Sequence, residues 1–276
     1  MDKFGKSQPV TRVEDVRFLP GAGNYVDDLA PANALQTFVF RSPVAHAQID
    51  TLNVDDARAA DGVVAVYTVD DLQAAGLDTA MFGAVVENRD GTKGASPERH
   101  LLAKDRVRFV GEPVAIVIAE TLAQARDAAE LIEFDYTDLP AKLDLAPGGE
   151  ALHAEAPDNL AFDWGLGDEA ATEAAFAAAA KTVKLDIGDN RVIVNSLEPR
   201  GCYAELEGNR LHVAINGQGV WGQKAALVRA LKIDEDDIRV TNPDVGGGFG
   251  MKAMPYPEFP VVAHAARTLG RPVRWM

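Results

Sequence analysis

The residues best suited to chemistry form one glycine-rich stretch, Asp244-Val245-Gly246-Gly247-Gly248-Phe249-Gly250-Met251-Lys252. Glycine has no Cβ, so its backbone N–H groups can approach a ligand closely, and it adopts positive φ angles without steric cost. Consecutive amides in such a turn make a concave site for an anion. Phe249 is the one aromatic residue of the stretch. The pattern predicts a loop that holds a phosphate-bearing or otherwise anionic cofactor.

The two common phosphate-binding patterns do not fit this stretch. A P-loop reads Gly-x-x-x-x-Gly-Lys-Ser/Thr, and a dinucleotide fingerprint reads Gly-x-Gly-x-x-Gly. Counted from Gly246, Met251 replaces the last glycine of either pattern, and Ala253 replaces the hydroxyl residue of the P-loop. A nucleotide-binding protein that uses the loop for phosphates is therefore the weakest of three hypotheses.

Composition narrows the class of protein. The chain has 276 residues, of which 47% are hydrophobic and 25% charged, and these are ordinary globular values. Its formal net charge of −15 would repel nucleic acids and anionic membranes, so neither is expected as a partner. No apolar run is long enough to span a membrane, and the first residues do not resemble a signal peptide.

Cysteine and histidine usage argue against several kinds of site. Cys202 is the only cysteine, so the chain can form no internal disulfide and can hold no cysteine-ligated cluster by itself. A reducing compartment, the cytoplasm, is the simpler expectation. The five histidines are scattered without the spacing of metal ligands.

The elements of the first half mix short strands and helices. β-Branched and aromatic runs bounded by turn residues predict strands, and Thr121 is expected to cap a helix that reaches Glu130. A short helix is expected over 69–76. The predicted strands cover 35–40, 63–68, 114–119 and 131–137.

The second half begins after an expected linker over 142–168, which contains Pro147-Gly148-Gly149. The alanine-rich run from Glu169 to Lys181 predicts a helix, and a turn at Glu207-Gly208-Asn209 predicts a hairpin. Further helices are expected over 220–231 and 258–269. Strands are expected over 181–187, 192–195, 202–206, 211–215 and 238–241.

Five ordered segments together identify a family resemblance: Arg12–Asp28, Arg41–Ala47, Val107–Ala115, Glu198-Pro199-Arg200 and Val245–Lys252. The sequence resembles the large, molybdenum-cofactor-binding subunit of the molybdenum hydroxylases, the xanthine dehydrogenase and aldehyde oxidase family. Within that family it is most similar to the branch that contains aerobic carbon monoxide dehydrogenase large chains. The match extends over nearly the whole chain.

The resemblance implies an α+β fold in two parts. Residues 12–141 are expected to form an α/β-hammerhead domain, followed by the linker over 142–168. Residues 169–276 are expected to form the first, incomplete part of a mixed α/β molybdopterin-binding domain. Family members of this type continue for several hundred residues more, so we expect a fragment of a large subunit, with a split subunit as the alternative.

The resemblance also implies which residues meet the cofactor. The glycine loop is expected to pack against the molybdenum centre and the pterin, and Gln218 in Asn216-Gly217-Gln218-Gly219 to reach the oxygen ligands of the metal. An amide can donate a hydrogen bond there without competing for the metal, and no residue of this chain is expected to bind molybdenum directly. The structural alternative for Gln218 is a cap on the following helix. The implied cofactor contacts are Gln218, Gly246, Gly247, Gly248, Phe249 and Gly250.

The implied enzyme is a molybdenum hydroxylase that oxidises a small substrate with water as the oxygen source. The substrate would be carbon monoxide, an aldehyde or an N-heterocycle; a purine is disfavoured because Ala253 stands where purine-oxidising relatives carry a glutamate. The cofactor is molybdenum–molybdopterin, with FAD and 2Fe-2S clusters on medium and small partner subunits. The general base is expected beyond residue 276, so the isolated chain should be inactive. The alternative function is a non-catalytic binding or assembly module of such a complex.

Overall fold

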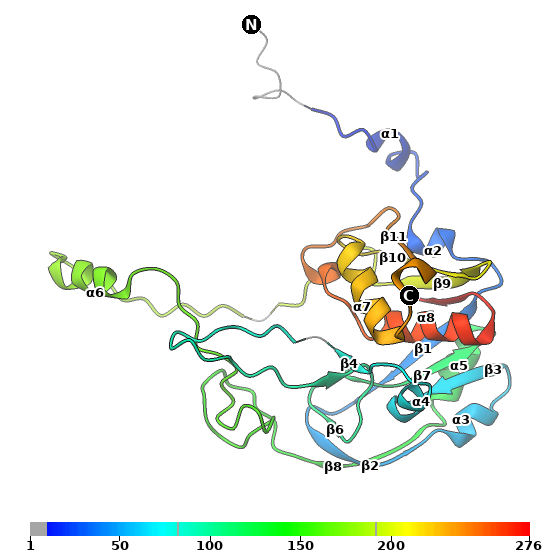
Figure 1. The fold of residues 1–276 in the computed structure, drawn as a ribbon, viewed down its shortest axis with the longest axis horizontal. Helices are drawn as coiled ribbons and strands as arrows, with labels where there is room; N and C mark the ends of the chain where they lie inside the picture. The colour runs from blue at the N-terminus through cyan, green and yellow to red at the C-terminus, as the bar shows by residue number, and fades with distance from the viewer. Residues whose placement is uncertain (1–9, 82, 191) are drawn as a thin grey trace, which may run out of the picture.

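The computed structural model describes residues 10–81, 83–190 and 192–276. The described residues form one large mixed sheet and two small ones (Figure 1). The large sheet has the strand order β11-β10-β9-β12-β1-β7-β3, in which β1 pairs in parallel with β12, β10 pairs in parallel with β11, and the other neighbours are antiparallel. Its strands are β1 (Leu35–Arg41), β3 (Val63–Tyr67), β7 (Pro113–Ala119), β9 (Cys202–Glu207), β10 (Arg210–Ile215), β11 (Ile238–Thr241) and β12 (Val273–Trp275).

The large sheet joins the two halves of the chain. Strands β1, β3 and β7 come from the expected hammerhead region, and β9 to β12 come from the expected cofactor-binding region. The join is the pairing of β1 with β12, where Leu35 lies opposite Val273. The two halves therefore share a continuous backbone hydrogen-bond network, although the domain boundaries themselves stay a prediction.

Two smaller sheets complete the strands of the described residues. One has the order β6-β2-β8 and the other pairs β4 with β5. The predicted strand over 131–137 is β8, but it pairs with β2 and not with the large sheet that contains β7. The strands of the small sheets are β2 (Ala47–Asn53), β4 (Ala80–Met81), β5 (Arg99–His100), β6 (Arg106–Val107) and β8 (Glu133–Asp138).

Helices begin and end where local chemistry indicates. The Thr121 side chain accepts from the Gln124 N–H and so caps α5 as predicted, and Thr68 caps α4 in the same way. Gly270, at φ 64°, ends α8 in the left-handed region that glycine favours. The helices are α1 (Asp15–Phe18), α2 (Val26–Leu29), α3 (Asp55–Ala59), α4 (Val69–Ala74), α5 (Leu122–Ala129), α6 (Glu169–Ala178), α7 (Trp221–Leu231) and α8 (Glu258–Leu269), with 3-10 turns η1 (Glu235–Asp237) and η2 (Met251–Ala253).

Helices cover both faces of the large sheet. Side chains alternate along β7, so Ile116 and Ile118 pack in the cluster that contains α8, whereas Val117 packs in the cluster that contains α5. Every residue of α8 from Glu258 to Ala266 is buried. No helix among the described residues is long and apolar enough to cross a membrane.

Two predicted strands are wrong. Residues 181–187 and the run 192–195 form no strand, and Val183, Leu185 and Ile187 are exposed. The alternating pattern is typical of a strand, but a strand also needs a neighbouring backbone to pair with. This segment instead leads away from the body of the molecule toward α6 (Figure 1), so the described residues offer it no partner.

His264 on α8 gives stability a dependence on pH. Its ring packs edge-on against Tyr67, with centroids 5.4 Å apart, and burial, together with the charge of Arg267, lowers the imidazole pKa from its ordinary value. In the unfolded chain the imidazole has a pKa of about 6.5 and binds protons more readily than in the folded chain. The stability contributed by the neutral, buried imidazole is therefore fully present above pH 6.5, and it is lost as pH falls through the folded pKa. We expect the melting temperature to fall between pH 7.5 and 5.5, and His264→Gln to reduce that fall in scanning calorimetry. An equal fall in the variant would contradict this assignment.

Candidate functional site

The glycine loop and the Gln218 turn lie side by side because two parallel strands end together. Strands β10 and β11 are parallel neighbours, and the turn follows one while the loop follows the other. The Asn242 amide ties them: its Nδ2 donates to the Gly217 carbonyl at 2.7 Å, and its Oδ1 accepts from the Gly217 N–H at 3.1 Å. The carboxyl edge of such strands is where open α/β sheets bind ligands.

Gln218 lies directly on the glycine loop. Its backbone N–H donates to the Lys252 carbonyl at 3.1 Å, and its Oε1 accepts from the Gly250 N–H at 2.8 Å. A Cβ on Gly248 would lie 2.6 Å from the Gln218 Cδ, so only glycine admits this approach. Within the described part of the chain, the Gln218 Nε2 has no acceptor, and the side chain is exposed. The amide is thus oriented through its oxygen and left with two N–H donors.

Three consecutive backbone amides of the loop also lack acceptors. Among the described residues, the N–H groups of Gly247, Gly248 and Phe249 have no hydrogen-bond partner. The backbone turns sharply here, with φ angles of 101° at Gly247, 50° at Phe249 and 84° at Gly250. Phe249 as a whole residue is 75% exposed. Unpaired amides beside an oriented carboxamide are the donor set that an anionic cofactor with oxo groups requires.

Two of the glycines are needed for packing inside the protein, in addition to any contact with a ligand. The sequence suggests that missing Cβ atoms admit a ligand, but a Cβ on Gly246 would lie 2.5 Å from the Glu198 Cβ. A Cβ on Gly247 would lie 3.0 Å from the Ser196 Cβ. Close contact with the protein beneath the loop therefore requires glycine at 246, and at 247 the φ of 101° requires it as well.

A buried ion pair that the sequence reasoning missed supports the loop. The Lys252 Nζ donates to the Glu198 Oε2 at 2.9 Å, and the same oxygen accepts from the Gly246 N–H at 2.7 Å. The side chains of Lys252 and Glu198 are 1% and 10% exposed. Both residues lie in segments that carry the family resemblance, but they are 54 positions apart and no spacing rule connects them.

The N-terminal segment fixes the start of the loop. The Arg17 guanidinium pairs with the Asp244 carboxylate, which also accepts from the Asn24 N–H at 2.7 Å. The hydrogen bond from Arg17 lowers the Asp244 pKa below its ordinary value. Asp244 therefore stays ionised at neutral pH and is engaged by a cation.

Other reactive side chains near the loop have structural partners. Arg200 stacks on the Tyr256 ring, with its guanidinium carbon 3.7 Å from the centroid, and lies 3.5 Å from a carboxylate oxygen of the buried Glu258. Cys202 is buried, and burial raises the pKa of its thiol well above the ordinary value. The His46 Nδ1 lies 2.7 Å from the Pro140 carbonyl oxygen. These contacts give each of the three side chains a structural surrounding within the chain.

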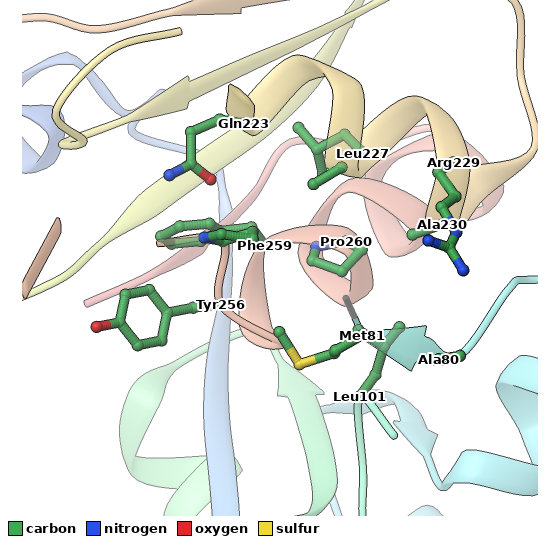
Figure 2. A pocket seen from close by; sticks show the side chains of 12 residues that line it. Ala80, Met81, Leu101, Gln223, Leu227, Arg229, Ala230, Tyr256, Phe259 and Pro260 are labelled. Carbon is green, nitrogen blue, oxygen red and sulfur yellow. The ribbon is translucent and has the colours of Figure 1, made fainter. Parts of the chain in front are cut away.

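An apolar pocket between β4, α7 and the start of α8 is separate from this site (Figure 2). Gln223 lines the pocket, and its Nε2 donates to the carbonyl oxygens of Ala253 and Met254, at 3.3 and 3.1 Å. These bonds fix the segment that follows the loop. Neither Gln218 nor any of the described loop residues 246–250 lines the pocket.

Two family models match the chain. Residues 20–140 match the α/β hammerhead domain of aldehyde oxidase and xanthine dehydrogenase, and residues 152–276 match a molybdopterin cofactor-binding domain. The carbon monoxide dehydrogenase large chain of Hydrogenophaga pseudoflava is 35% identical over 95% of this chain and 34% of its own length. The nicotine 6-hydroxylase large subunit of Paenarthrobacter nicotinovorans is 35% identical over 99% of this chain and 33% of its own.

Solved structures agree with these matches. A Cu,Mo carbon monoxide dehydrogenase superposes with a TM-score of 0.83 at 31% identity, and quinoline 2-oxidoreductase from Pseudomonas putida 86 with 0.79 at 36%. Each comparison covers 97% of this chain and 34% of the other. The chain therefore spans about one third of the length of the relatives it matches. It belongs to the molybdenum hydroxylase family of aldehyde oxidases and xanthine dehydrogenases, and carries the family's hammerhead and molybdopterin-binding domains.

Proposed function

We propose that this chain forms one wall of the cofactor site in the large subunit of a molybdenum hydroxylase. The observation that carries the proposal is the Gln218 amide held on the glycine loop by Gly250. Among the described residues, its Nε2 and the nearby N–H groups of Gly247 to Phe249 have no acceptor. That donor set fits an oxo-bearing, anionic cofactor. Molybdenum–molybdopterin would supply the redox chemistry when bound.

The residues of this chain would bind and orient the cofactor, and they would not transfer protons in the reaction. The Gln218 Nε2 would donate to an oxygen ligand of the metal, and the loop amides to the cofactor face. Phe249 would shield that face from bulk water. Glu198 and Asp244, the carboxylates that contact the loop, are engaged by Lys252 and Arg17, so we assign the general base to a residue outside this chain.

The proposed substrate is a small molecule: carbon monoxide, an aldehyde or an N-heterocycle, with water as the source of the transferred oxygen. Relatives named as carbon monoxide dehydrogenase, nicotine 6-hydroxylase and aldehyde oxidoreductase support this range. Ala253 follows Lys252 and carries no polar group for a purine, so a purine is disfavoured. FAD and 2Fe-2S clusters are proposed to lie on medium and small partner subunits, because Cys202 alone cannot hold a cluster.

A non-catalytic binding or assembly module is the second candidate function. The exposed apolar side chains of residues 183–194 favour it, because they are suited to contact another polypeptide. The two functions differ in cofactor content. Molybdenum and pterin near one per chain, in protein purified from its native host with whatever accompanies it, would support the enzyme. Folded chain without molybdenum would support the module.

The role of Gln218 is tested in the same purified complex. With Gln218→Ala we expect turnover per bound molybdenum to fall about 100-fold, the usual effect of removing one donor from a developing charge. Carbon monoxide, an aldehyde and an N-heterocycle serve as trial substrates, and molybdenum content is measured in each sample. Gln48→Ala, on β2, is the matched control and should leave both quantities unchanged. Unaltered turnover in Gln218→Ala would reject the assigned contact.

A further inference from the structure

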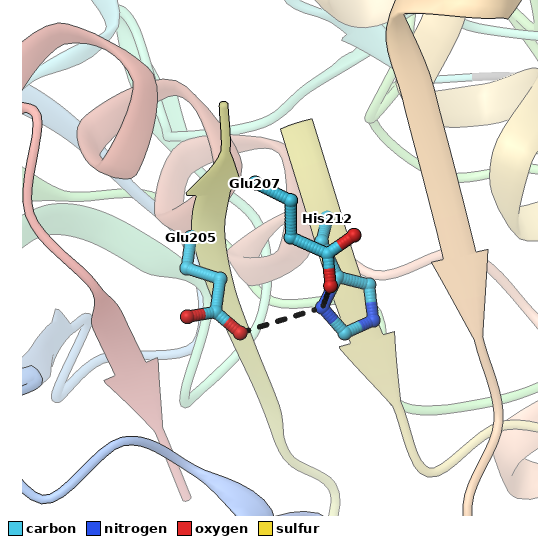
Figure 3. Close-up of side chains that lie close together, drawn as sticks. All are labelled: Glu205, Glu207 and His212. Carbon is cyan, nitrogen blue, oxygen red and sulfur yellow. Dashed lines mark ion pairs between the residues drawn. The ribbon is translucent and has the colours of Figure 1, made fainter. Parts of the chain in front are cut away.

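Two carboxylates and a histidine converge at the turn end of the β9–β10 hairpin, away from the glycine loop (Figure 3). His212 on β10 lies directly opposite Glu205 on β9. Glu207 is two residues further along β9, so its side chain emerges on the same face as that of Glu205. One ligand atom from each residue lies within 4.8 Å of the others. The register of the hairpin therefore brings these three side chains together, although the spacing of the histidines in the sequence does not indicate a metal site.

The imidazole is oriented with one nitrogen toward the carboxylates. The His212 Nε2 lies 2.8 Å from the Thr241 Oγ1 on the neighbouring strand. The Nδ1 is buried and has no hydrogen-bond partner among the described residues, and the whole residue is 6% exposed. Metal-binding histidines usually have the second ring nitrogen held by a hydrogen bond, and the Thr241 hydroxyl gives His212 such a bond.

Distances favour a cation between the three side chains. The Nδ1 lies 3.5 Å from the Glu205 Oε1 and 3.4 Å from the Glu207 Oε1. An N–H···O hydrogen bond would be about 2.7–3.2 Å long. Ligand atoms around a tetrahedral Zn²⁺, with bonds of about 2.0–2.2 Å, lie about 3.3–3.5 Å apart. The two nitrogen–oxygen separations match the edge of a coordination tetrahedron better than a hydrogen bond.

We propose that Glu205, Glu207 and His212 bind one divalent transition-metal cation, with Zn²⁺ as the reference ion. One imidazole and two carboxylates are a ligand set that such ions accept. The Glu207 side chain is 42% exposed, so water can complete the coordination. Arg239 donates to both Glu207 oxygens, at 3.2 and 3.0 Å. It is 49% exposed, and a solvated ion pair of this kind is weak enough for a metal to displace.

The ion would stabilise the hairpin by linking its two strands, and it would take no part in catalysis. The site joins β9 to β10 beside the turn at Gly208, and Thr241 extends the support to β11. Gln218 follows the opposite end of β10. Since the site is independent of the molybdenum cofactor, its test does not depend on the proposed function.

Zinc binding to the purified full chain, with any subunits that accompany it, tests the site. After treatment with EDTA, protein is titrated with ZnCl2 in a calorimeter at pH 7.5, and bound zinc is counted by mass spectrometry after gel filtration. We expect one more zinc per wild-type chain than per Glu205→Gln/Glu207→Gln chain. The single variant Glu207→Gln should raise the Kd at least tenfold, and it alters a side chain that is 42% exposed.

The control is Glu169→Gln/Glu173→Gln on α6, a helix with no buried residues, which removes the same charge. It should retain the wild-type zinc. X-ray absorption should show one imidazole nitrogen and oxygen ligands at about 2.0–2.2 Å. Equal zinc content in wild type and Glu205→Gln/Glu207→Gln would overturn the proposal. So would wild type that binds no zinc and shows by NMR an imidazolium held between the two carboxylates.

Discussion

Lys252→Met is expected to lower the free energy of unfolding by about 3–4 kcal/mol, the usual effect of removing one partner from a buried ion pair. The Lys252 ammonium contacts the Glu198 carboxylate at 2.9 Å, and both side chains are nearly excluded from water. Without the cation, the carboxylate keeps only the Gly246 N–H as a donor among its described contacts. Urea-induced unfolding, followed by tryptophan fluorescence, measures the change.

Two further variants isolate the cause. Glu198→Gln/Lys252→Met removes the uncompensated charge and should regain at least half of the lost stability. Lys224→Met breaks the 3.2 Å pair with Glu235, whose side chain is 64% exposed, and should cost less than about 1 kcal/mol. A cost for Lys252→Met no larger than that for Lys224→Met would show that the ion pair does not support the loop.

Gly248→Ala is expected to abolish most molybdenum binding while leaving the chain folded. The new Cβ would lie 2.6 Å from the Gln218 Cδ and 2.7 Å from its Oε1, so the amide must leave the loop and lose its bond from Gly250. Gly248 is not in the left-handed region, and an exposed glutamine can move, so the stability cost should stay below about 1 kcal/mol. Molybdenum and pterin are measured per chain in complex from the native host.

Gly222→Ala is the matched control for this substitution. Gly222 is the second residue of α7, and an added Cβ there meets nothing within 4 Å. Alanine should therefore change the stability by less than about 1 kcal/mol. Its molybdenum content should equal that of the wild type. Full molybdenum occupancy in Gly248→Ala would show that the position of Gln218 does not govern cofactor binding.

Local sequence chemistry predicted most of the elements. The cap at Thr121 and the hairpin turn at Gly208 each depend on residues a few positions apart. The predicted helix over 169–181 forms as α6, although it ends at Ala178. The strand predicted over 181–187 is absent because pairing depends on a distant backbone, which hydrophobic alternation cannot supply.

The sequence by itself determined the family, the location of the glycine loop and the candidate Gln218, because these depend on residue types in ordered segments. The tertiary structure decided which distant side chains meet around the loop and in the β9–β10 hairpin. Glu198 meets Lys252 across 54 positions, and His212 meets Glu205 through hairpin register. Both contacts depend on which strands pair and where each one ends. That information belongs to the sheet as a whole, and no short stretch of the chain contains it.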